Sequence, residues 1–452
     1  MQWIAERMGE TTTMWVALGL FAATYLGLMI FSKARAYIAL GAAALFVLLG
    51  IIPLGKVPGA VDWNVILMIA GTMGTVTLFI ESRMPAKMAD WLIEKSPNLK
   101  WAVIWLSVFA GVISAFVDNV ATVLMIAPVA VGIAKKLKVS PVPAIIAISI
   151  ASNLEGAATL VGDTTSILLA GAAKLNFLDF FFYRPPGAAH YGVGLFWIVQ
   201  VAFVAATAVL FVIFRKDKQP IHLEERETVR DYMPTALLLG TVISLILVSF
   251  VPSEFRLGSL TLHKPAAING IICVGIYLIG VLWYGLVKRN KKIILITLKE
   301  LDYFTLLLLA GLFVVIGGLE HSGVVREIGE LFAKIANGNA FLIYTILVWF
   351  SMIISAFVDN IPYVATMLPV VTVISTAMGI SPAVLYFGLL SGATLGGNLT
   401  PIGASANIAA LGILRKEGHQ VKAKAFMKIS VPYTLAACLV GYGLVWVFWS
   451  GK

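Results

Sequence analysis

The sequence predicts an all-α polytopic membrane protein made of two inverted-topology repeats. Of its 452 residues, 60% are apolar and 12% are charged, and the mean hydropathy is +0.94. Soluble globular domains carry roughly 25% charged residues. The hexapeptide SAFVDN occurs at 114–119 and again at 355–360, and the same spacing aligns further identities as far as Gly162 and Gly403. The chain therefore contains an internal duplication.

Eight apolar runs account for most of the predicted membrane crossings, because most are long enough to span roughly 30 Å of hydrocarbon. The first is expected to be a membrane helix rather than a signal peptide, since Glu6 and Glu10 precede it and Lys33 follows it without a clear cleavage pattern. The runs cover residues 13–31, 38–54, 61–80, 191–214, 233–251, 265–287, 303–319 and 429–449. Four further apolar runs flank the repeated motifs.

Each repeat is predicted to hold three spans, a re-entrant hairpin, an interrupted helix and a final span. Repeat 1 covers residues 1–214, with its hairpin at 100–134 and its interrupted helix at 141–173. A charged cytoplasmic linker at 215–232 follows. Repeat 2 covers residues 233–452, with its hairpin at 340–378 and its interrupted helix at 382–414. Five crossings per repeat place the second repeat upside down relative to the first.

The positive charges predict the orientation. Of the 33 Lys and Arg residues, 24 lie in the segments 32–37, 81–100, 135–140, 215–232, 288–300 and 415–428. Cytoplasmic loops are enriched in these residues, so both termini are expected on the non-cytoplasmic side of a prokaryotic plasma membrane. The first hairpin should then enter from the cytoplasm and the second from outside. The net charge of +10 follows membrane topology, so no nucleic-acid partner is expected.

Asp118 and Asp359 are the most informative residues of the hairpins, because an ionisable side chain inside a membrane is costly and indicates function. Each is followed by an asparagine, and Asn119 and Asn360 are suitable N-caps for the helices that follow. An alternative is that the two aspartates only cap broken helices.

The interrupted helices carry the second set of candidates. Their sequences are SNLEGAATLVGDTTS at 152–166 and ATLGGNLTPIGASAN at 393–407. Glycines beside polar residues in an apolar setting indicate unwound membrane helices whose carbonyls bind ions, although glycines also mediate close helix packing. The candidate ion- or substrate-binding residues are Asp118, Asn119, Asn153, Glu155, Thr159, Asp163, Thr164, Thr165, Asp359, Asn360, Asn398, Thr400, Ser405 and Asn407.

The balance of charge in these segments predicts a cation or a proton as coupling ion. Four acids, Asp118, Glu155, Asp163 and Asp359, are expected to cluster, whereas basic residues such as Lys135 and Lys174 fall outside. Buried carboxylates without a partner must bind a cation or become protonated. Candidate Na⁺ ligands are Asp118, Asp163 and Asp359, and H⁺ is the alternative coupling ion. The repeats differ here, since Gly396 and Ala404 stand where repeat 1 has Glu155 and Asp163.

Several functions are not indicated. Cys273 and Cys438 lie inside predicted spans and the five histidines lack ligand spacing, so no structural metal centre and no other cofactor are expected. The chain has no phosphate-binding loop and no nucleophile constellation, which argues against ATP hydrolysis and against an intramembrane enzyme.

The chain resembles the ion transporter superfamily with a citrate-transporter-like domain, in the branch of arsenite permeases (ArsB), melanosomal P proteins and NhaD-type sodium/proton antiporters. The segments SAFVDNVATVLMIAPV, SAFVDNIPYVATMLPV and GGNLTPIGASANIAALGI carry this resemblance. It implies an elevator-type homodimer in which a scaffold supports a moving transport domain.

Two departures from relatives bear on the substrate. Thr164 and Thr165 after Gly-Asp resemble the sodium/proton antiporters. Dicarboxylate symporters of the wider group have Ser-Asn-Thr at the hairpin tips, where this chain has Asp118 and Asp359. A carboxylate there would repel a dianion by about 4 kcal/mol at ~4 Å and an effective dielectric constant of ~20.

The expected function is secondary active transport of a small inorganic ion through the lipid bilayer by alternating access, coupled to H⁺ or Na⁺. Sodium/proton exchange and export of an arsenite-like or other anion are the two leading forms. The alternatives are a Na⁺-coupled carboxylate (citrate or dicarboxylate) symporter and an ion channel. The sequence does not decide whether a partner ATPase docks on the basic cytoplasmic loops.

Overall fold

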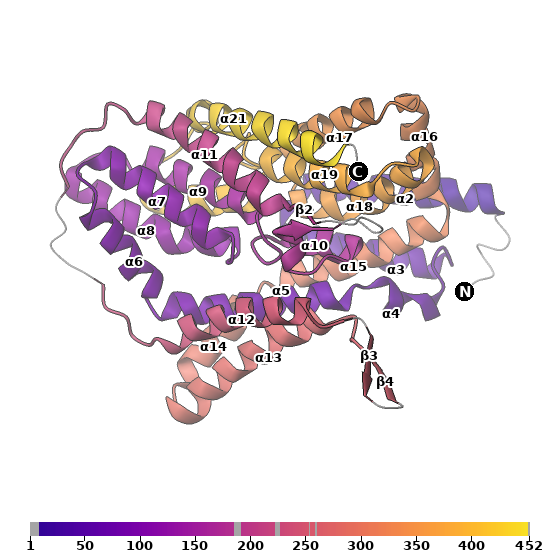
Figure 1. The fold of residues 1–452 in the computed structure, drawn as a ribbon, viewed down its shortest axis with the longest axis horizontal. Coiled ribbons are helices and arrows are strands. Elements are labelled where there is room, and N and C mark those ends of the chain that lie inside the picture. The colour runs from indigo at the N-terminus through magenta and orange to yellow at the C-terminus, as the bar shows by residue number, and fades with distance from the viewer. Residues whose placement is uncertain (1–8, 185–190, 222–226, 253, 258–259, 451–452) are drawn as a thin grey trace.

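The computed structural model describes residues 9–184, 191–221, 227–252, 254–257 and 260–450, and it is an all-helical bundle apart from two short β-hairpins (Figure 1). Before the linker the helices are α2 (Glu10–Ile30), α3 (Arg35–Leu48), α4 (Val57–Ala60), α5 (Trp63–Glu81), α6 (Met84–Glu94), α7 (Leu99–Ser114), α8 (Asn119–Leu137), α9 (Val142–Gly156), α10 (Thr164–Ala173) and α11 (Leu195–Ile213). After it come α12 (Met233–Ser249), α13 (Ile268–Leu282), α14 (Lys291–Glu300), α15 (Tyr303–His321), α16 (Val324–Ala336), α17 (Ala340–Ser355), α18 (Asn360–Met378), α19 (Pro382–Gly396), α20 (Ser405–Lys416) and α21 (Ala423–Trp449).

Short elements complete the description. The strands β1 (Phe182–Tyr183) and β2 (Gly192–Val193) form one antiparallel pair, and β3 (Glu254–Leu257) and β4 (Leu260–His263) form the other. Single turns lie at Ser32–Ala34, Leu54–Lys56 and Leu178–Phe180, and a π-helical turn at Trp283–Val287 extends α13.

The helix boundaries repeat the duplication seen in the sequence. Helix α7 begins at Leu99 and α17 at Ala340, and α8 begins at Asn119 and α18 at Asn360. The helices before the hairpins also correspond, since α5 and α15, and likewise α6 and α16, begin 240 residues apart. The duplication thus extends further toward the N-terminus than the sequence identities do. The amphipathic helices α6 and α16 were not predicted.

Side-chain caps fix these boundaries in both repeats. Asn98 accepts a hydrogen bond from the Trp101 N–H at 3.2 Å and begins α7, and Asn339 does the same for Leu342 at 3.0 Å before α17. A side-chain oxygen at this position satisfies an N–H group that the helix itself leaves unpaired.

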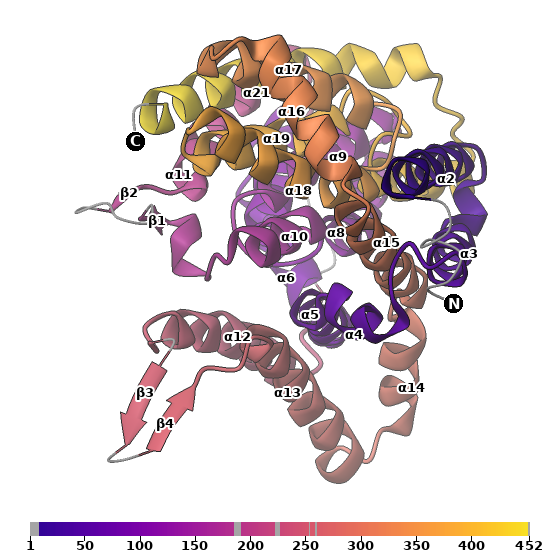
Figure 2. The same ribbon diagram turned by 90° about the vertical axis from the view of Figure 1, so that its right-hand side faces the viewer.

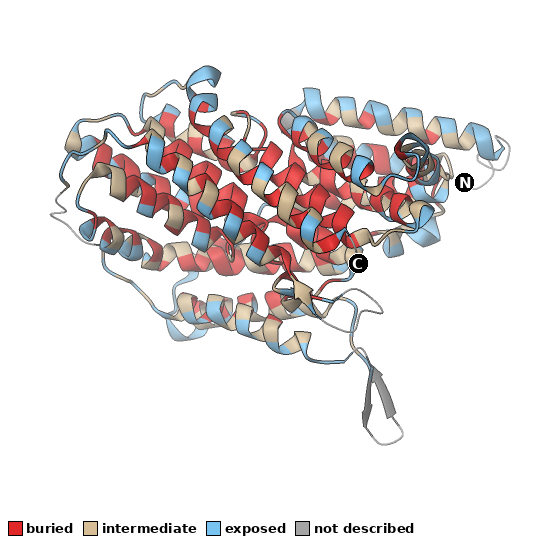
Figure 3. Cartoon of the chain, turned by 45° about the horizontal axis from the view of Figure 1, so that its top comes forward, coloured by how far each residue is buried: buried red, intermediate tan, exposed pale blue. Residues whose placement is uncertain are grey.

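The two hairpins approach the centre of the bundle from opposite ends. In Figure 1, α7 and α8 lie toward the left and α17 and α18 toward the right, so their tips meet in the middle. Helix α9 packs between α7 and α8, and α19 between α17 and α18. All residues of α9 from Ile145 and of α19 from Ala383 are buried, as is typical of central helices. Figure 3 shows this concentration of buried residues in the core.

The outer helices link the two repeats. Helix α3 packs against α15 and α5 packs against α13, so the second span of each repeat contacts the third span of the other. Figure 2 shows α12 and α13 at the periphery beside α5, and the β3–β4 hairpin projects outward between these two helices and away from α5. Among the described residues, eight helices are long and apolar enough to cross a membrane, and α16 and α17 form a pair bent by 119°. The chain is therefore an integral membrane protein.

Gly162 and Gly403 allow each interrupted helix to contact its hairpin tip. A Cβ atom on Gly162 would lie 2.6 Å from the Gly156 carbonyl and 2.8 Å from that of Ser114. A Cβ atom on Gly403 would lie 2.7 Å from the Gly397 carbonyl and 2.9 Å from that of Ser355. Each hairpin tip is thus fixed to the unwound segment of its own repeat.

We expect Gly403→Ala to lower the free energy of unfolding by about 1–3 kcal/mol, because the added methyl group must displace fixed backbone carbonyls. Gly412→Ala is the matched control in the helix that follows, where no atom lies within 4 Å of the new Cβ. Thermal unfolding in detergent compares the two variants. Equal unfolding temperatures for the two variants would show that the hairpin tip can move away from the added methyl group without loss of stability.

Candidate ion-binding site

The helix that begins at each hairpin tip is capped by an aspartate. The Asp118 carboxylate accepts hydrogen bonds from the N–H groups of Val120 at 3.0 Å and Ala121 at 3.1 Å. Asp359 accepts one from the Ile361 N–H at 3.1 Å. The prediction that Asn119 and Asn360 are the N-caps is therefore wrong by one residue. The aspartates have the capping geometry, which leaves Asn119 and Asn360 as the first residues of α8 and α18.

Asp359 also forms an ion pair with Arg35. The Arg35 Nη1 atom lies 2.8 Å from Asp359 Oδ2, and the two side chains are only 17% and 10% exposed. The Arg35 Nε–H donates to the Leu28 carbonyl at 3.0 Å. This finding corrects the expectation that the basic residues all lie outside the acidic segments, because Arg35 was counted as a cytoplasmic loop charge. Ser405 lies at the edge of the same group, 3.4 Å from Asp359 Oδ2.

Helix α2 contacts the second hairpin at a further point. The Tyr25 hydroxyl donates a hydrogen bond to the Pro362 carbonyl and lies 2.6 Å from the Thr366 hydroxyl. The start of α18 is therefore attached to α2 as well as to Arg35.

Asp163 lies between the two tips at the start of α10. Thr165 donates to Asp163 Oδ2 at 2.9 Å, and the Asn360 amide approaches the same oxygen at 3.5 Å. The Asp163 carboxyl also interacts electrostatically with Asp118 and with Asp359. Asp118, Asp163 and Asp359 are thus close enough to interact at the hairpin tips. Thr164, the residue after Asp163, is also buried.

Asn153 joins the two repeats at the centre of the bundle. Its side chain accepts from Asn119 at 2.9 Å, and it donates to the Thr394 carbonyl at 2.8 Å and to Asn398 at 3.1 Å. Asn398 in turn donates to the Ile150 carbonyl at 2.9 Å. This buried amide network connects the first hairpin tip to both interrupted helices.

Other candidates hold the backbone rather than facing the acids. Thr159 donates to the Ala115 carbonyl and Thr400 to the Ala356 carbonyl, so equivalent hydroxyls fix the two hairpin tips. The Asn407 amide donates to the carbonyls of Gly397 at 3.0 Å and Thr400 at 3.1 Å, which closes the second unwound segment.

Glu155 does not join the other acids. Its Oε2 atom accepts from Gln200 of α11 at 2.7 Å, and Gly111 of α7 packs beside its Cγ. The hydrogen-bond partners of Asp163 come instead from α10 and α18. The expected cluster of four acids is therefore a group of three with Glu155 apart.

The acids alone do not form a metal centre in this conformation. In the described ranges, no three His, Cys, Asp or Glu side chains lie close enough together to hold a metal ion. A Na⁺ ion at Asp163 would need hydroxyl, amide or carbonyl oxygens as further ligands, such as those of Thr165 and Thr394, whose hydroxyls are 3.4 Å apart. The role of Asp118, Asp163 and Asp359 as Na⁺ ligands stays a prediction.

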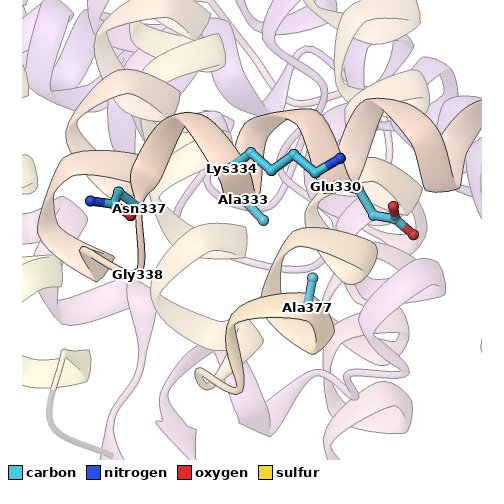
Figure 4. Close-up of a pocket in the computed structure, with 6 residues that line it drawn as sticks. All are labelled: Glu330, Ala333, Lys334, Asn337, Gly338 and Ala377. Carbon is cyan, nitrogen blue, oxygen red and sulfur yellow. The ribbon is translucent and has the colours of Figure 1, made fainter.

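A cavity of about 1230 Å³ lies between the outer helices and the second hairpin, and neither Asp163 nor Asp359 is among its lining residues. Its walls come from α5, α13 and α15 on one side and from α10 and α18 on the other, and its charged residues are Asp62, Lys174, Lys264 and Glu320. A hollow of about 420 Å³ lies elsewhere, at the ends of α16 and α18 (Figure 4), and its charged residues are Glu330 and Lys334. The first cavity borders the helices that carry Asp163 and Asp359.

Two opposed hairpins, two interrupted helices and a buried polar network between them define a polytopic membrane transporter with inverted repeats. The chain belongs to the citrate transporter family, whose model matches residues 25–392. This confirms the resemblance inferred from the repeated motifs. The protein is accordingly a transporter and not an enzyme.

Relatives and solved structures agree with this assignment. The chain is 30% identical over 443 residues to an uncharacterized transporter of Mycobacterium tuberculosis, covering 96% of this chain and 98% of that protein. It is 28% identical to the human P protein, covering 84% of this chain and 53% of the P protein.

Two transporter structures share the fold at 15% identity. The YdaH transporter of Alcanivorax borkumensis has a TM-score of 0.58 and covers 91% of this chain and 96% of its own. MtrF of Neisseria gonorrhoeae, described within a class of antimetabolite efflux pumps, has a TM-score of 0.57. The match covers 90% of this chain and 85% of the MtrF chain.

Sequence reasoning missed Arg35, Tyr25, Gln200 and Thr394. Thr394 could have been found, since it occupies the position of Asn153 in the second repeat. Arg35 carried no such signal, because it lies at the end of an apolar run where a loop charge is common.

Proposed function

We propose that the protein is a secondary active transporter for a small inorganic ion, coupled to H⁺ or Na⁺ and working by alternating access. The observation that carries this proposal is the position of Asp163 between the two hairpin tips. Three carboxyl groups interact there, and the one cation that pairs with them among the described residues is Arg35. The net negative charge favours a bound cation or proton.

The fold supports alternating access. Helices α10 and α18 border both the acidic region and the large cavity, so a shift of these helices against α5, α13 and α15 would open and close a path. The distribution of Lys and Arg supports both termini on the non-cytoplasmic side of a prokaryotic plasma membrane. On that orientation the cavity opens to the outside. A homodimer, which the family resemblance implies, is part of the proposal and is tested by the mass of the protein in detergent.

A carboxylate substrate is the second candidate, favoured by the description of the family and by the Arg35 guanidinium. Arginine binds carboxylates through paired hydrogen bonds. In this structure the guanidinium is occupied by Asp359, and the remaining acids would repel a polyanion. A citrate substrate therefore fits best when a cation accompanies it.

A flux panel in proteoliposomes distinguishes these candidates. The probes are Na⁺, arsenite and citrate with and without Mg²⁺, each tested under an imposed pH gradient and under an imposed Na⁺ gradient. We expect one probe to accumulate against its own gradient when H⁺ or Na⁺ supplies the driving force. Flux that ignores both gradients, or that far exceeds carrier rates, would contradict coupled transport.

A further inference from the structure

Glu155 is a buried acid that the site between the hairpin tips does not use. Its side chain is 0% exposed, and Gln200 donates to one of its two carboxylate oxygens. In the described part of the chain, the other oxygen, Oε1, has no hydrogen-bond partner. Burying an ionised carboxylate in this way is costly unless the group takes up a proton.

Among the residues that the structure describes, Glu155 has no ion pair with a Lys, Arg or His side chain. A Cβ atom on Gly111 of α7 would lie 3.0 Å from the Glu155 Cγ, and the titratable group that interacts with Glu155 from α21 is Tyr433. The Tyr433 hydroxyl is also buried and, among the residues described, has no hydrogen-bond partner. Two unsatisfied oxygens therefore lie in the same wall between α9, α11 and α21.

The second repeat shows that the fold does not require an acid there. The residue equivalent to Glu155 is Gly396, and the residue equivalent to Gly111 is Met352. The backbone of Met352 contacts the position where a Gly396 side chain would begin. In each repeat one large residue packs against one small residue where these two helices meet. The large residue is Glu155 in the first repeat and Met352 in the second, so only the first repeat places a carboxyl group there.

We propose that Glu155 and Tyr433 form a proton-binding site separate from the site at Asp163. A proton on Oε1 removes the buried charge and gives that oxygen a hydrogen to donate. The recorded polar partners of the Glu155 side chain do not suit Na⁺, because Gln200 presents an N–H group and Tyr433 offers a single hydroxyl oxygen. Hard cations are bound by several oxygen ligands.

On this proposal the transported ion and the coupling proton bind at two different sites. The site between the hairpin tips binds the transported ion, and the Glu155 site binds the coupling proton. That division rests on the proposed function, whereas the protonation of Glu155 does not.

Infrared difference spectroscopy of the purified protein tests protonation without any substrate. We expect the wild type to show a carboxylic-acid C=O band that disappears at alkaline pH and is missing in Glu155→Gln. Tyr433→Phe removes one hydroxyl without a partner and should shift that band. Asp90→Asn is the control, a buried carboxyl outside the spanning segments that accepts from the Glu227 N–H at 2.8 Å. Identical spectra for wild type and Glu155→Gln at every pH would overturn the proposal. If Glu155→Gln does not fold, the Tyr433→Phe spectrum decides, and an unshifted band would overturn it equally.

Transport then tests the coupling. Using the probe that the flux panel identifies, Glu155→Gln should retain exchange of that probe across the membrane but lose at least about tenfold of its pH-driven accumulation, equal to ~1.4 kcal/mol. A parallel loss of exchange and accumulation would overturn the division between the sites. If no probe moves in the wild type, the proposed function fails, while the infrared result still decides the proton site.

Discussion

Asp163→Asn should abolish gradient-driven transport while leaving thermal stability close to that of the wild type. The asparagine keeps the shape of the side chain and can still accept the Thr165 hydrogen bond of 2.9 Å. It loses the charge that attracts a cation between the tips. A carboxylate attracts a monovalent cation at ~4 Å by about 4 kcal/mol at an effective dielectric constant of ~20, and losing even half of this weakens cation affinity by roughly 30-fold.

Stability should survive because the second repeat already has Ala404 at the equivalent position. The measurements are flux in proteoliposomes at rising concentration of the ion that binds between the hairpin tips and the unfolding midpoint in detergent. Asp90→Asn controls for loss of a buried carboxyl elsewhere, where burial raises the pKa of the group. Normal flux at low ion concentration in Asp163→Asn would remove this residue from the site.

Breaking the ion pair between Arg35 and Asp359 should produce the second large effect. Arg35→Gln leaves the Asp359 carboxylate without its partner in a largely buried position, and removing one member of such a pair costs about 3 kcal/mol. Asp359→Asn should be destabilising for the converse reason. The double variant should recover most of the loss, giving a coupling free energy of about 1–3 kcal/mol.

The exposed pair between Lys135 and Glu417 provides a matched control. Their atoms are 2.5 Å apart, but the lysine side chain is 66% exposed, so the coupling free energy should stay below about 1 kcal/mol. Unfolding titrations of both double-mutant cycles give the two values. Equal coupling free energies would show that the Arg35 pair is effectively solvated.

The same variant has a functional consequence. In the wild type the guanidinium competes with any cation for the Asp359 carboxylate. Arg35→Gln should therefore raise the apparent affinity for the cation that binds between the hairpin tips in flux measurements. A lowered affinity would indicate that Arg35 helps to bind an anionic substrate instead.

The sequence indicates the two hairpins because both copies of one pattern carry the same information. The second hairpin was placed at 340–378, and α17 and α18 cover that range with a break at the repeated Asp359. Caps, glycines and apolar runs act locally, so they can be read along the chain.

The residues that set charge balance could not be predicted in this way. Arg35 and Asp359 are 324 residues apart, and nothing local indicates that they meet. The direction of the Glu155 side chain depends on the rotation of α9 and on Gln200 from a later helix. Both outcomes follow from packing between distant segments.

Asn153 and Thr394 have an evolutionary consequence. They occupy equivalent positions in the two repeats, and they touch each other, so the pseudo-twofold axis passes between them. In an ancestral pair of identical chains, a residue on such an axis would have faced its own copy, and any change would have altered both sides at once. Fusion of two such copies into one gene would remove that constraint. We infer that the asparagine could then specialise on one side of the axis while the other side kept a smaller hydroxyl.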